Sequence, residues 1–342
     1  MTTRAFITGV SGTELTAAER EFIRDERPWG FILFKRNIET PAQVTALVAE
    51  MRDAGGVADA PVLIDQEGGR VQRLGPPHWP VYPPGAVFAK LYDTDSALGL
   101  TAARLSARLI AADLADLGIT VDCLPLADVP VPGADAVIGN RAYGTEPGKV
   151  AAIARAVTDG LEQGGVLPVL KHIPGHGRAT ADTHFKLPTV DTPRDELERT
   201  DFAAFKPLAD LPMAMTAHVV FSAIDPAHPA TTSATMIAHV IRGVIGFQGL
   251  LMSDDVSMNA LAGSLAERTR AIFVAGCDMA LHCNGNIEEM RDVAAQTPEL
   301  SGRALERAKA ALAARKAPQP FDRAAARAEL DALIARANTA TA

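Results

Sequence analysis

Cysteine is scarce in this chain, and its three residues form no CxxC pair. Cys123, Cys277 and Cys283 lie in apolar or strand-like surroundings. An odd and sparse set suits a reducing compartment without structural disulfides. The N-terminal segment also lacks the long apolar stretch and small-residue cleavage site of a secretory signal. We therefore expect a cytoplasmic protein.

Basic clusters and long apolar runs are missing as well. The 33 Lys and Arg residues face 41 Asp and Glu residues, so the net charge is −8. No stretch rich in Lys and Arg would form a surface for nucleic acid or for an anionic membrane. No apolar run is long enough to span a bilayer. The expected partner is a small molecule, with no nucleic acid and no membrane involved.

No Pro/Gly/Ser-rich linker and no long internal repeat divides the 342 residues. With 48% hydrophobic residues, the chain is long enough to bury a large core. We expect a single catalytic domain over residues 1–342, and a monomer.

Eight short apolar runs alternate with amphipathic helical stretches, which is typical of βα units. Continuous apolar strands are expected where a parallel sheet is covered on both faces. Eight such units predict an α/β fold with one (β/α)₈ TIM-type barrel, and a doubly wound open sheet is the alternative. The runs are "AFITG" (from Ala5), "GFILF" (Gly30), "PVLID" (Pro61), "ITVDCLP" (Ile119), "LPVLKH" (Leu167), "PMAMTAH" (Pro212), "LLMSDD" (Leu250) and "MALHC" (Met279).

Helix start signals support this interpretation. Thr16 with Glu19 in "TAAE" resembles a capping box, and "TPAQ" from Thr40 repeats it with proline at the first helical position. Helices are expected over 100–118, 149–165 and 265–276. Two further Ala/Arg-rich helices, within residues 302–337, should pack on the outside of the barrel.

Polar residues recur where the predicted strands end. Active sites of such barrels lie at the carboxyl ends of the strands, so these residues should share one pocket. They are Asp65, Asp122, Lys171 with His172, His218, and Asp254 with Asp255.

The stretch "KHIPGHGRATADTHFKLP", residues 171–188, follows the fifth predicted strand and admits four interpretations: a metal site, a phosphate cradle, a catalytic loop or a surface loop. His172 and His176 have a helical ligand spacing, but the Pro and Gly residues around them argue against a helix, and no HExxH or cysteine set accompanies them. The glycines match no phosphate-binding motif. A long loop above a pocket favours the catalytic interpretation.

Asp182 and His184 in "DTH" could form a proton shuttle, because a carboxylate can accept the imidazole N–H and stabilise the imidazolium. Asp254 would project from its strand end as the counterpart. A carboxylate facing a proton donor suits covalent glycoside hydrolysis, although most such enzymes use two carboxylic groups.

These motifs together resemble the single-domain bacterial β-N-acetylglucosaminidases of glycoside hydrolase family 3. The combination of "KHIPGHG", "DTH" and "SDD" is specific, and further matching stretches run from the first to the seventh predicted strand. They are "WGFILFKRNIETP", "LIDQEGGRVQRL", "VIGNRAYG" and "MTAHVVF".

The resemblance implies roles for the matching residues. Asp254 corresponds to the nucleophile, His184 to the acid/base and Asp182 to the residue that orients His184. Asp255 is expected to be structural, while His176 and His218 should line the pocket or position the loop. The matches to sugar-binding positions are Asp65, Arg73, Arg141, Lys171 and His172.

The implied reaction is retaining hydrolysis of a terminal β-linked N-acetylglucosamine, without cofactor or metal. The implied substrates are GlcNAc-containing muropeptides or anhydro-muropeptides, with roles in peptidoglycan recycling, cell-wall biogenesis, cell shape and the cell cycle. One departure is Arg178, which stands where many relatives carry aspartate in "GHGD". The alternatives are a phosphorylase that uses the same nucleophile, a family 3 β-glucosidase, a non-catalytic sugar-binding barrel and a metal-dependent hydrolase.

Overall fold

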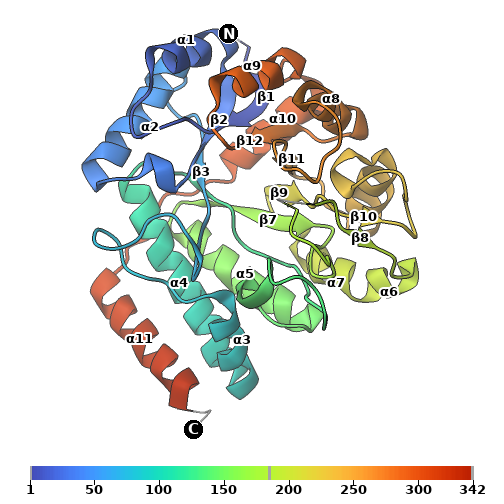
Figure 1. The fold of residues 1–342 in the computed structure, drawn as a ribbon. Coiled ribbons are helices and arrows are strands. Elements are labelled where there is room, and N and C mark those ends of the chain that lie inside the picture. The colour runs from blue at the N-terminus through green and yellow to red at the C-terminus, as the bar shows by residue number, and fades with distance from the viewer. Residues whose placement is uncertain (1, 184–185, 340–342) are drawn as a thin grey trace.

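The computed structural model describes residues 2–183 and 186–339. Eight parallel strands form a closed barrel in the order β1-β12-β11-β9-β7-β6-β3-β2 (Figure 1). This confirms the predicted (β/α)₈ barrel and excludes the open sheet. The barrel strands are β1 (Arg4–Thr8), β2 (Pro28–Leu33), β3 (Val62–Ile64), β6 (Val121–Asp122), β7 (Leu167–Ile173), β9 (Met213–Thr216), β11 (Leu250–Asp255) and β12 (Met279–His282).

Helices surround the barrel, and short accessory strands extend its loops. Two accessory pairs form small sheets: β4 (Gln66–Gly68) with β5 (Val71–Gln72), and β8 (Thr189–Val190) with β10 (Val220–Phe221). The α-helices are α1 (Ala17–Glu26), α2 (Pro41–Gly55), α3 (Gly85–Thr94), α4 (Ser96–Asp116), α5 (Pro147–Gln163), α6 (Arg194–Arg199), α7 (Asp201–Phe205), α8 (Leu265–Ala275), α9 (Ile287–Gln296), α10 (Gly302–Ala313) and α11 (Arg323–Thr339). The short 3₁₀ segments are η1 (Lys35–Asn37), η2 (Gly139–Arg141), η3 (Lys206–Leu208) and η4 (Ala230–Thr232), while η5 (Met236–Val244) is a π-helix.

The predicted helix start signals are present. The Thr16 side chain and Glu19 form the reciprocal capping box of α1. At α2, Thr40 accepts the backbone N–H of Gln43, but the Gln43 side chain accepts from Glu39 N, one residue earlier than in a capping box. Both arrangements satisfy backbone N–H groups that the first helical turn leaves unpaired.

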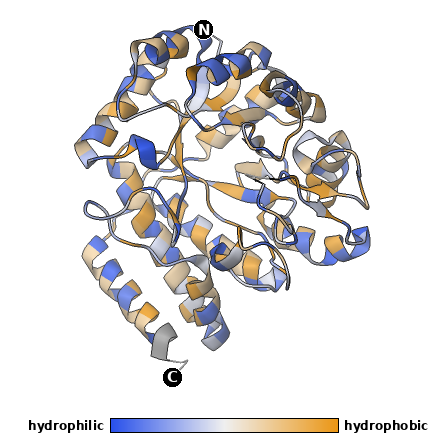
Figure 2. Cartoon of the chain, in the orientation of Figure 1, coloured by the Kyte–Doolittle hydropathy of each residue, from blue (hydrophilic) through white to orange (hydrophobic). Residues whose placement is uncertain are grey.

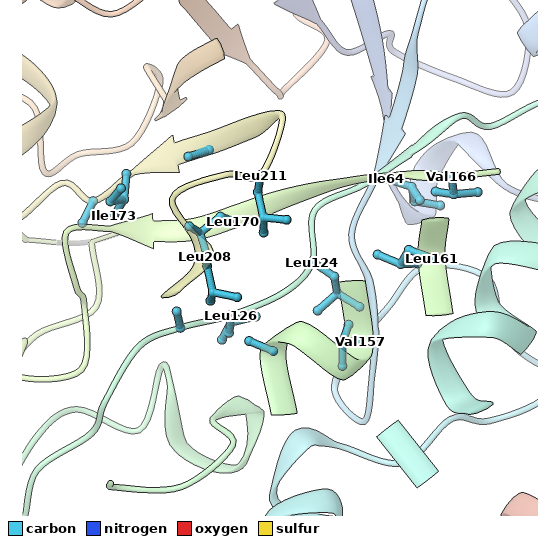
Figure 3. Packing of buried hydrophobic residues seen from close by; sticks show 14 of the residues in the cluster. Ile64, Leu124, Leu126, Val157, Leu161, Val166, Leu170, Ile173, Leu208 and Leu211 are labelled. Atoms are coloured by element: carbon cyan, nitrogen blue, oxygen red, sulfur yellow. The ribbon is translucent and has the colours of Figure 1, made fainter. Parts of the chain in front are cut away.

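The core has an inner and an outer layer because successive side chains of a strand point to opposite faces. On β11, Leu250 and Met252 fill the barrel, whereas Leu251 faces the helices. Figure 3 shows part of the outer layer, where Val157 and Leu161 of α5 join side chains of the neighbouring strands. Figure 2 shows that the barrel strands consist largely of hydrophobic residues, whereas the helices carry both hydrophobic and hydrophilic residues. None of the helices within residues 2–183 and 186–339 has the length and apolar character needed to cross a membrane.

The two C-terminal helices occupy different places. Helix α11 lies outside, against α3 and α4, as expected (Figure 1). Helix α10 packs against the interior of the barrel, because Ala308 and Ala311 belong to the same core cluster as the inward-facing strand residues. Leu305 and Leu312 of α10 pack against the same cluster and lie on the same face of the helix.

Candidate active site

A cavity of about 310 Å³ lies at the carboxyl ends of the barrel strands. This is the end at which barrel enzymes place their active sites. Seven of the eight residues predicted for the site line this cavity, and the eighth, His184, lies outside the described residues. The seven are Asp65, Arg73, Arg141, Lys171, His172, Asp182 and Asp254.

Asp65 directly follows β3 and is held by two cations. Its carboxylate accepts hydrogen bonds from Lys171 Nζ at 2.8 Å and from Arg73 Nη2 at 3.0 Å. Burial by itself would raise the pKa of Asp65, but Lys171 and Arg73 outweigh burial and hold it well below its ordinary value. Asp65 is therefore a carboxylate with both partners fixed, which suits acceptance of sugar hydroxyl protons.

Glu67 completes this network, and sequence reasoning missed it. Arg141 binds its two oxygens through Nε at 2.8 Å and Nη2 at 2.7 Å, a bidentate arrangement. Lys171 Nζ lies 2.7 Å from the same carboxylate. Burial opposes ionisation, but Lys171 and Arg141 lower the pKa of Glu67 to about 2. The available signal was its position two residues after Asp65 in "DQEGG".

Lys171 thus lies between two carboxylates and is almost completely buried. Burial disfavours its charge, yet Asp65 and Glu67 raise its pKa above the ordinary value. The ammonium therefore stays charged and can donate to a ligand in the cavity. A buried network with every member paired is rigid, so these donors and acceptors are positioned before a substrate arrives.

A second carboxylate–imidazole pair lies beside this network. Asp128, fully buried after β6, has its Oδ2 2.7 Å from His172 Nδ1. Its Oδ1 accepts the backbone N–H of His176 at 2.7 Å and that of His172 at 3.3 Å. Burial would raise the pKa of Asp128, but His172 and His176 lower it. Sequence reasoning missed Asp128 as well.

Asp254 lies near the end of β11 and is buried at the cavity wall. Its Oδ1 accepts the backbone N–H of Asp255 at 2.8 Å. The Asp255 carboxylate accepts from Ser257 N at 3.0 Å, Ser257 Oγ at 2.7 Å and Cys283 N at 3.2 Å. These contacts agree with the structural role expected for Asp255, because they hold the backbone next to Asp254 in place.

Two of the polar strand-end residues are not among the described residues that line the cavity. Asp122 is fully buried, its Oδ1 accepts the backbone N–H of Gln66 at 3.0 Å, and burial raises its pKa well above the ordinary value. His218 lies between Thr231 Oγ1 at 2.7 Å and the Asp255 carbonyl at 3.0 Å. The expectation that all strand-end groups share one pocket is therefore wrong for these two, because the Asp122 side chain binds the backbone of Gln66 and the His218 ring is held between Thr231 and Asp255.

The loop after β7 is attached at both its beginning and its middle. Arg178 Nε binds Asp201 Oδ2 at 2.6 Å, and Arg178 Nη2 binds Glu196 at 3.0 Å. Further along, the Thr183 carbonyl accepts the backbone N–H of Ala260 at 3.2 Å. The last contact joins the residue after Asp182 to the segment that follows Asp254.

His176 is the second histidine on the cavity wall. Its side chain is 4% exposed, and its Nδ1 has no hydrogen-bond partner among the described residues. Burial, followed by the neighbouring His172, lowers the pKa of His176 to about 4. The ring is therefore neutral at physiological pH.

The metal interpretation finds no support in the described residues. No group of three His, Cys, Asp or Glu residues within residues 2–183 and 186–339 could hold a metal ion. The His172 and His176 rings are 5.6 Å apart, but Nδ1 of His172 is already bound to Asp128.

Comparison with known proteins agrees with this geometry. Residues 7–313 match the glycosyl hydrolase family 3 N terminal domain. This chain belongs to glycoside hydrolase family 3, and it is a glycoside hydrolase. A relative named beta-hexosaminidase, from Alkalilimnicola ehrlichii, is 40% identical over 81% of this chain and 79% of its own length.

Solved structures of family members share the whole fold. NagZ from Neisseria gonorrhoeae in complex with zinc ion has a TM-score of 0.86 at 29% identity, over 98% of this chain and 99% of its own. The same enzyme in complex with N-trifluoroacetyl-D-glucosamine has a TM-score of 0.82 at 32% identity, with the same coverage of both chains.

Proposed function

We propose that this family 3 hydrolase is a retaining exo-β-N-acetylglucosaminidase. The observation that carries the proposal is the position of Asp254 in the same small cavity as Asp65, Lys171 and Arg141. Glu67 holds the two cations of this set from behind. A cavity of about 310 Å³ is at the low end for ligand pockets and suits a single terminal sugar. The beta-hexosaminidase relative and the N-trifluoroacetyl-D-glucosamine complex of NagZ support N-acetylglucosamine as that sugar.

In the first proposed step, an Asp254 carboxylate oxygen attacks the anomeric carbon while the His184 imidazolium protonates the leaving oxygen. The glycosidic bond breaks and an Asp254 ester of the sugar forms. Neutral His184 then removes a proton from water, which attacks the ester and releases the sugar with net retention. Asp182 stabilises the imidazolium. Its position on the cavity wall, joined through Thr183 to the segment after Asp254, supports this role.

The sugar-binding role is proposed for Asp65, Arg73, Arg141, Lys171 and His172. Each Lys or Arg of this set is fixed by a carboxylate, so it can donate to a hydroxyl without first being ordered. The same proposal holds that residues 1–342 act as a single catalytic domain and as a monomer. It also holds that the protein works in the cytoplasm on peptidoglycan-derived muropeptides. No cofactor enters the reaction.

The test measures release of 4-nitrophenol from 4-nitrophenyl β-N-acetylglucosaminide. Asp254→Asn keeps the shape of the side chain but is a poor nucleophile, and it should lower kcat by about 10³-fold or more. The matched control is Asp292→Asn on the exposed surface of α9, which should keep wild-type activity. Full activity of Asp254→Asn would overturn the proposal.

Added reagents separate the alternatives in the same assay. A chelator should leave the rate of hydrolysis unchanged. Loss of activity in the presence of the chelator would instead indicate a metal-dependent hydrolase. Phosphate should produce no sugar 1-phosphate, which is the product a phosphorylase would release. Faster turnover of the matching β-glucoside would indicate a β-glucosidase.

A further inference from the structure

Asp128 is a buried carboxylate to which none of the proposed steps gives a role. It lies on the loop after β6, 44 residues before His172 in sequence, and it is completely inaccessible. Both of its oxygens are engaged: Oδ2 by the His172 ring, and Oδ1 by the backbone N–H groups of His172 near the end of β7 and of His176 in the loop that follows. Such a group can act on substrate only through the residues that it holds.

The contact with His172 Nδ1 restricts the state of the ring. An ionised carboxylate can only accept hydrogen bonds, so Nδ1 must carry a proton at this 2.7 Å contact. The His172 ring and two backbone N–H groups converge on the two Asp128 oxygens, and hydrogen bonds of this kind favour the ionised carboxylate. Nδ1 faces buried Asp128 while the ring lines the cavity, which leaves Nε2 as the nitrogen available to a ligand.

We propose that Asp128 is a positioning residue that fixes His172 as the Nδ1–H tautomer, so that Nε2 presents a lone pair to a sugar hydroxyl. This proposal rests on the proposed function, in which His172 binds the sugar. A hydroxyl both donates and accepts, and the neighbouring Lys171 and Arg141 are donors only. An acceptor at His172 therefore lets the same hydroxyl form a donated and an accepted hydrogen bond.

Asp128→Asn isolates this effect from simple support of the loop. The amide oxygen can keep the backbone N–H groups of His172 and His176, which now bind Oδ1. The amide NH₂ would then face His172 Nδ1, and because it is a donor, it favours the Nε2–H tautomer. Asp128→Ala would remove all three contacts and is the variant in which structural damage is expected.

The first measurement is spectroscopic and needs no substrate. Protein labelled with ¹⁵N-histidine reports the protonation of each ring nitrogen, with His172→Gln used to assign the His172 signals. Wild type should show His172 protonated at Nδ1 and unprotonated at Nε2 at neutral pH, and Asp128→Asn should show the reverse. A wild-type ring protonated only at Nε2, or an unchanged tautomer in Asp128→Asn, would overturn the proposal. If Asp128→Asn does not fold, the wild-type spectrum still tests the proposal, because it shows which ring nitrogen of His172 carries the proton.

The second measurement is a double-mutant cycle on kcat/KM with the 4-nitrophenyl substrate. Asp128→Asn and His172→Gln should each lower kcat/KM by about 10- to 100-fold, the cost of one misdirected buried hydrogen bond. The double variant should be within about 3-fold of the weaker single variant, because Asp128 acts through His172. Losses that multiply would overturn the proposal, since they would show that Asp128 acts independently of His172.

The two measurements separate this proposal from the proposed function. If wild type does not hydrolyse the N-acetylglucosaminide, the proposed function fails, while the spectrum still reports the tautomer that Asp128 imposes. If wild type hydrolyses it and the tautomer is the opposite one, only the Asp128 proposal fails.

Discussion

His172 and His176 lie side by side, yet their surroundings differ. His172 has a buried carboxylate at Nδ1, whereas Nδ1 of His176 has no partner within residues 2–183 and 186–339, and the pKa of His176 is lowered. The difference follows from Asp128, which offers an oxygen to the ring of one histidine and only to the backbone of the other. At the level of single residues, the hydrogen bonding of each imidazole in this cavity therefore depends on whether Asp128 contacts its ring.

The lowered pKa of His176 predicts how stability depends on pH. The folded pKa is about 4 against an ordinary value of 6.5, so between these values the unfolded state binds more protons. The difference in the pKa of His176 therefore contributes about 3 kcal/mol to the free energy of unfolding above pH 6.5. This contribution is lost progressively as the pH falls toward 4.

Urea denaturation across this pH window measures the effect. His176→Gln cannot titrate, so its stability should fall less than that of wild type over the same window. His239→Gln, at an exposed position on η5, is the control and should fall in parallel with wild type. Parallel curves for His176→Gln and wild type would contradict the prediction.

Among the secondary-structure elements, α6 and α7 anchor the β7 loop through the side chain of Arg178. Arg178 contacts Asp201, Glu196 and Thr200 on these helices. Asp201 is almost completely buried, so the guanidinium also compensates a carboxylate that would otherwise be unpaired. The residue that departs from the family pattern is therefore an anchor of this loop.

Loss of this anchor should affect the chemical step more than sugar binding. Arg178→Ala is expected to lower kcat by about 10- to 100-fold, because small displacements of reacting groups are costly, while KM changes less. The reason is that Asp65, Lys171 and Arg141 lie on other parts of the barrel and do not contact Arg178. Arg178→Lys keeps the charge and should recover part of the rate. Steady-state kinetics on the three proteins would contradict the prediction if KM rose and kcat stayed constant.

At the scale of the whole molecule, the two ends of the barrel are built differently. The carboxyl end opens into the charged cavity, whereas α10 contributes small apolar residues to the interior core. Helix α10 is also attached by charge: Asp278, just before β12, binds Arg307 of α10 at 2.9 Å and Arg242 at 2.8 Å. Helix α10 is thus attached to the barrel by both apolar and charged contacts.

Asp278→Asn tests this attachment. Removal of the charge leaves two largely buried guanidinium groups without their carboxylate, which should lower the free energy of unfolding by about 3 kcal/mol. Activity per folded molecule should not change, because Asp278 precedes its strand and the cavity lies at the opposite strand ends. Glu288→Ala, which breaks an exposed pair with Arg291, should cost under about 0.5 kcal/mol. Equal losses in denaturant titrations of the two variants would contradict the prediction.

The barrel could be predicted from the sequence alone, because its eight strands are short apolar runs separated by amphipathic stretches. The accessory strands and the helices α3, α6, α7 and α9 were not predicted. The sequence also determined which end of the barrel carries the polar groups, since a residue at the carboxyl end of a parallel strand must lie at that end. Asp65, Lys171 and Asp254 could be predicted for this reason. The carboxylate–imidazole spacing in "DTH" suggested Asp182, and the family motifs added Arg73 and Arg141, which periodicity does not reveal.

The pairing of these groups could not be predicted from the sequence and depends on the three-dimensional arrangement of the strands. Lys171 reaches Asp65 across 106 residues of sequence, and His172 reaches Asp128 across 44. No local pattern encodes such distances, because they arise from the closure of the barrel and from the direction in which each side chain points. The same holds for Glu67 and for the anchor at Arg178.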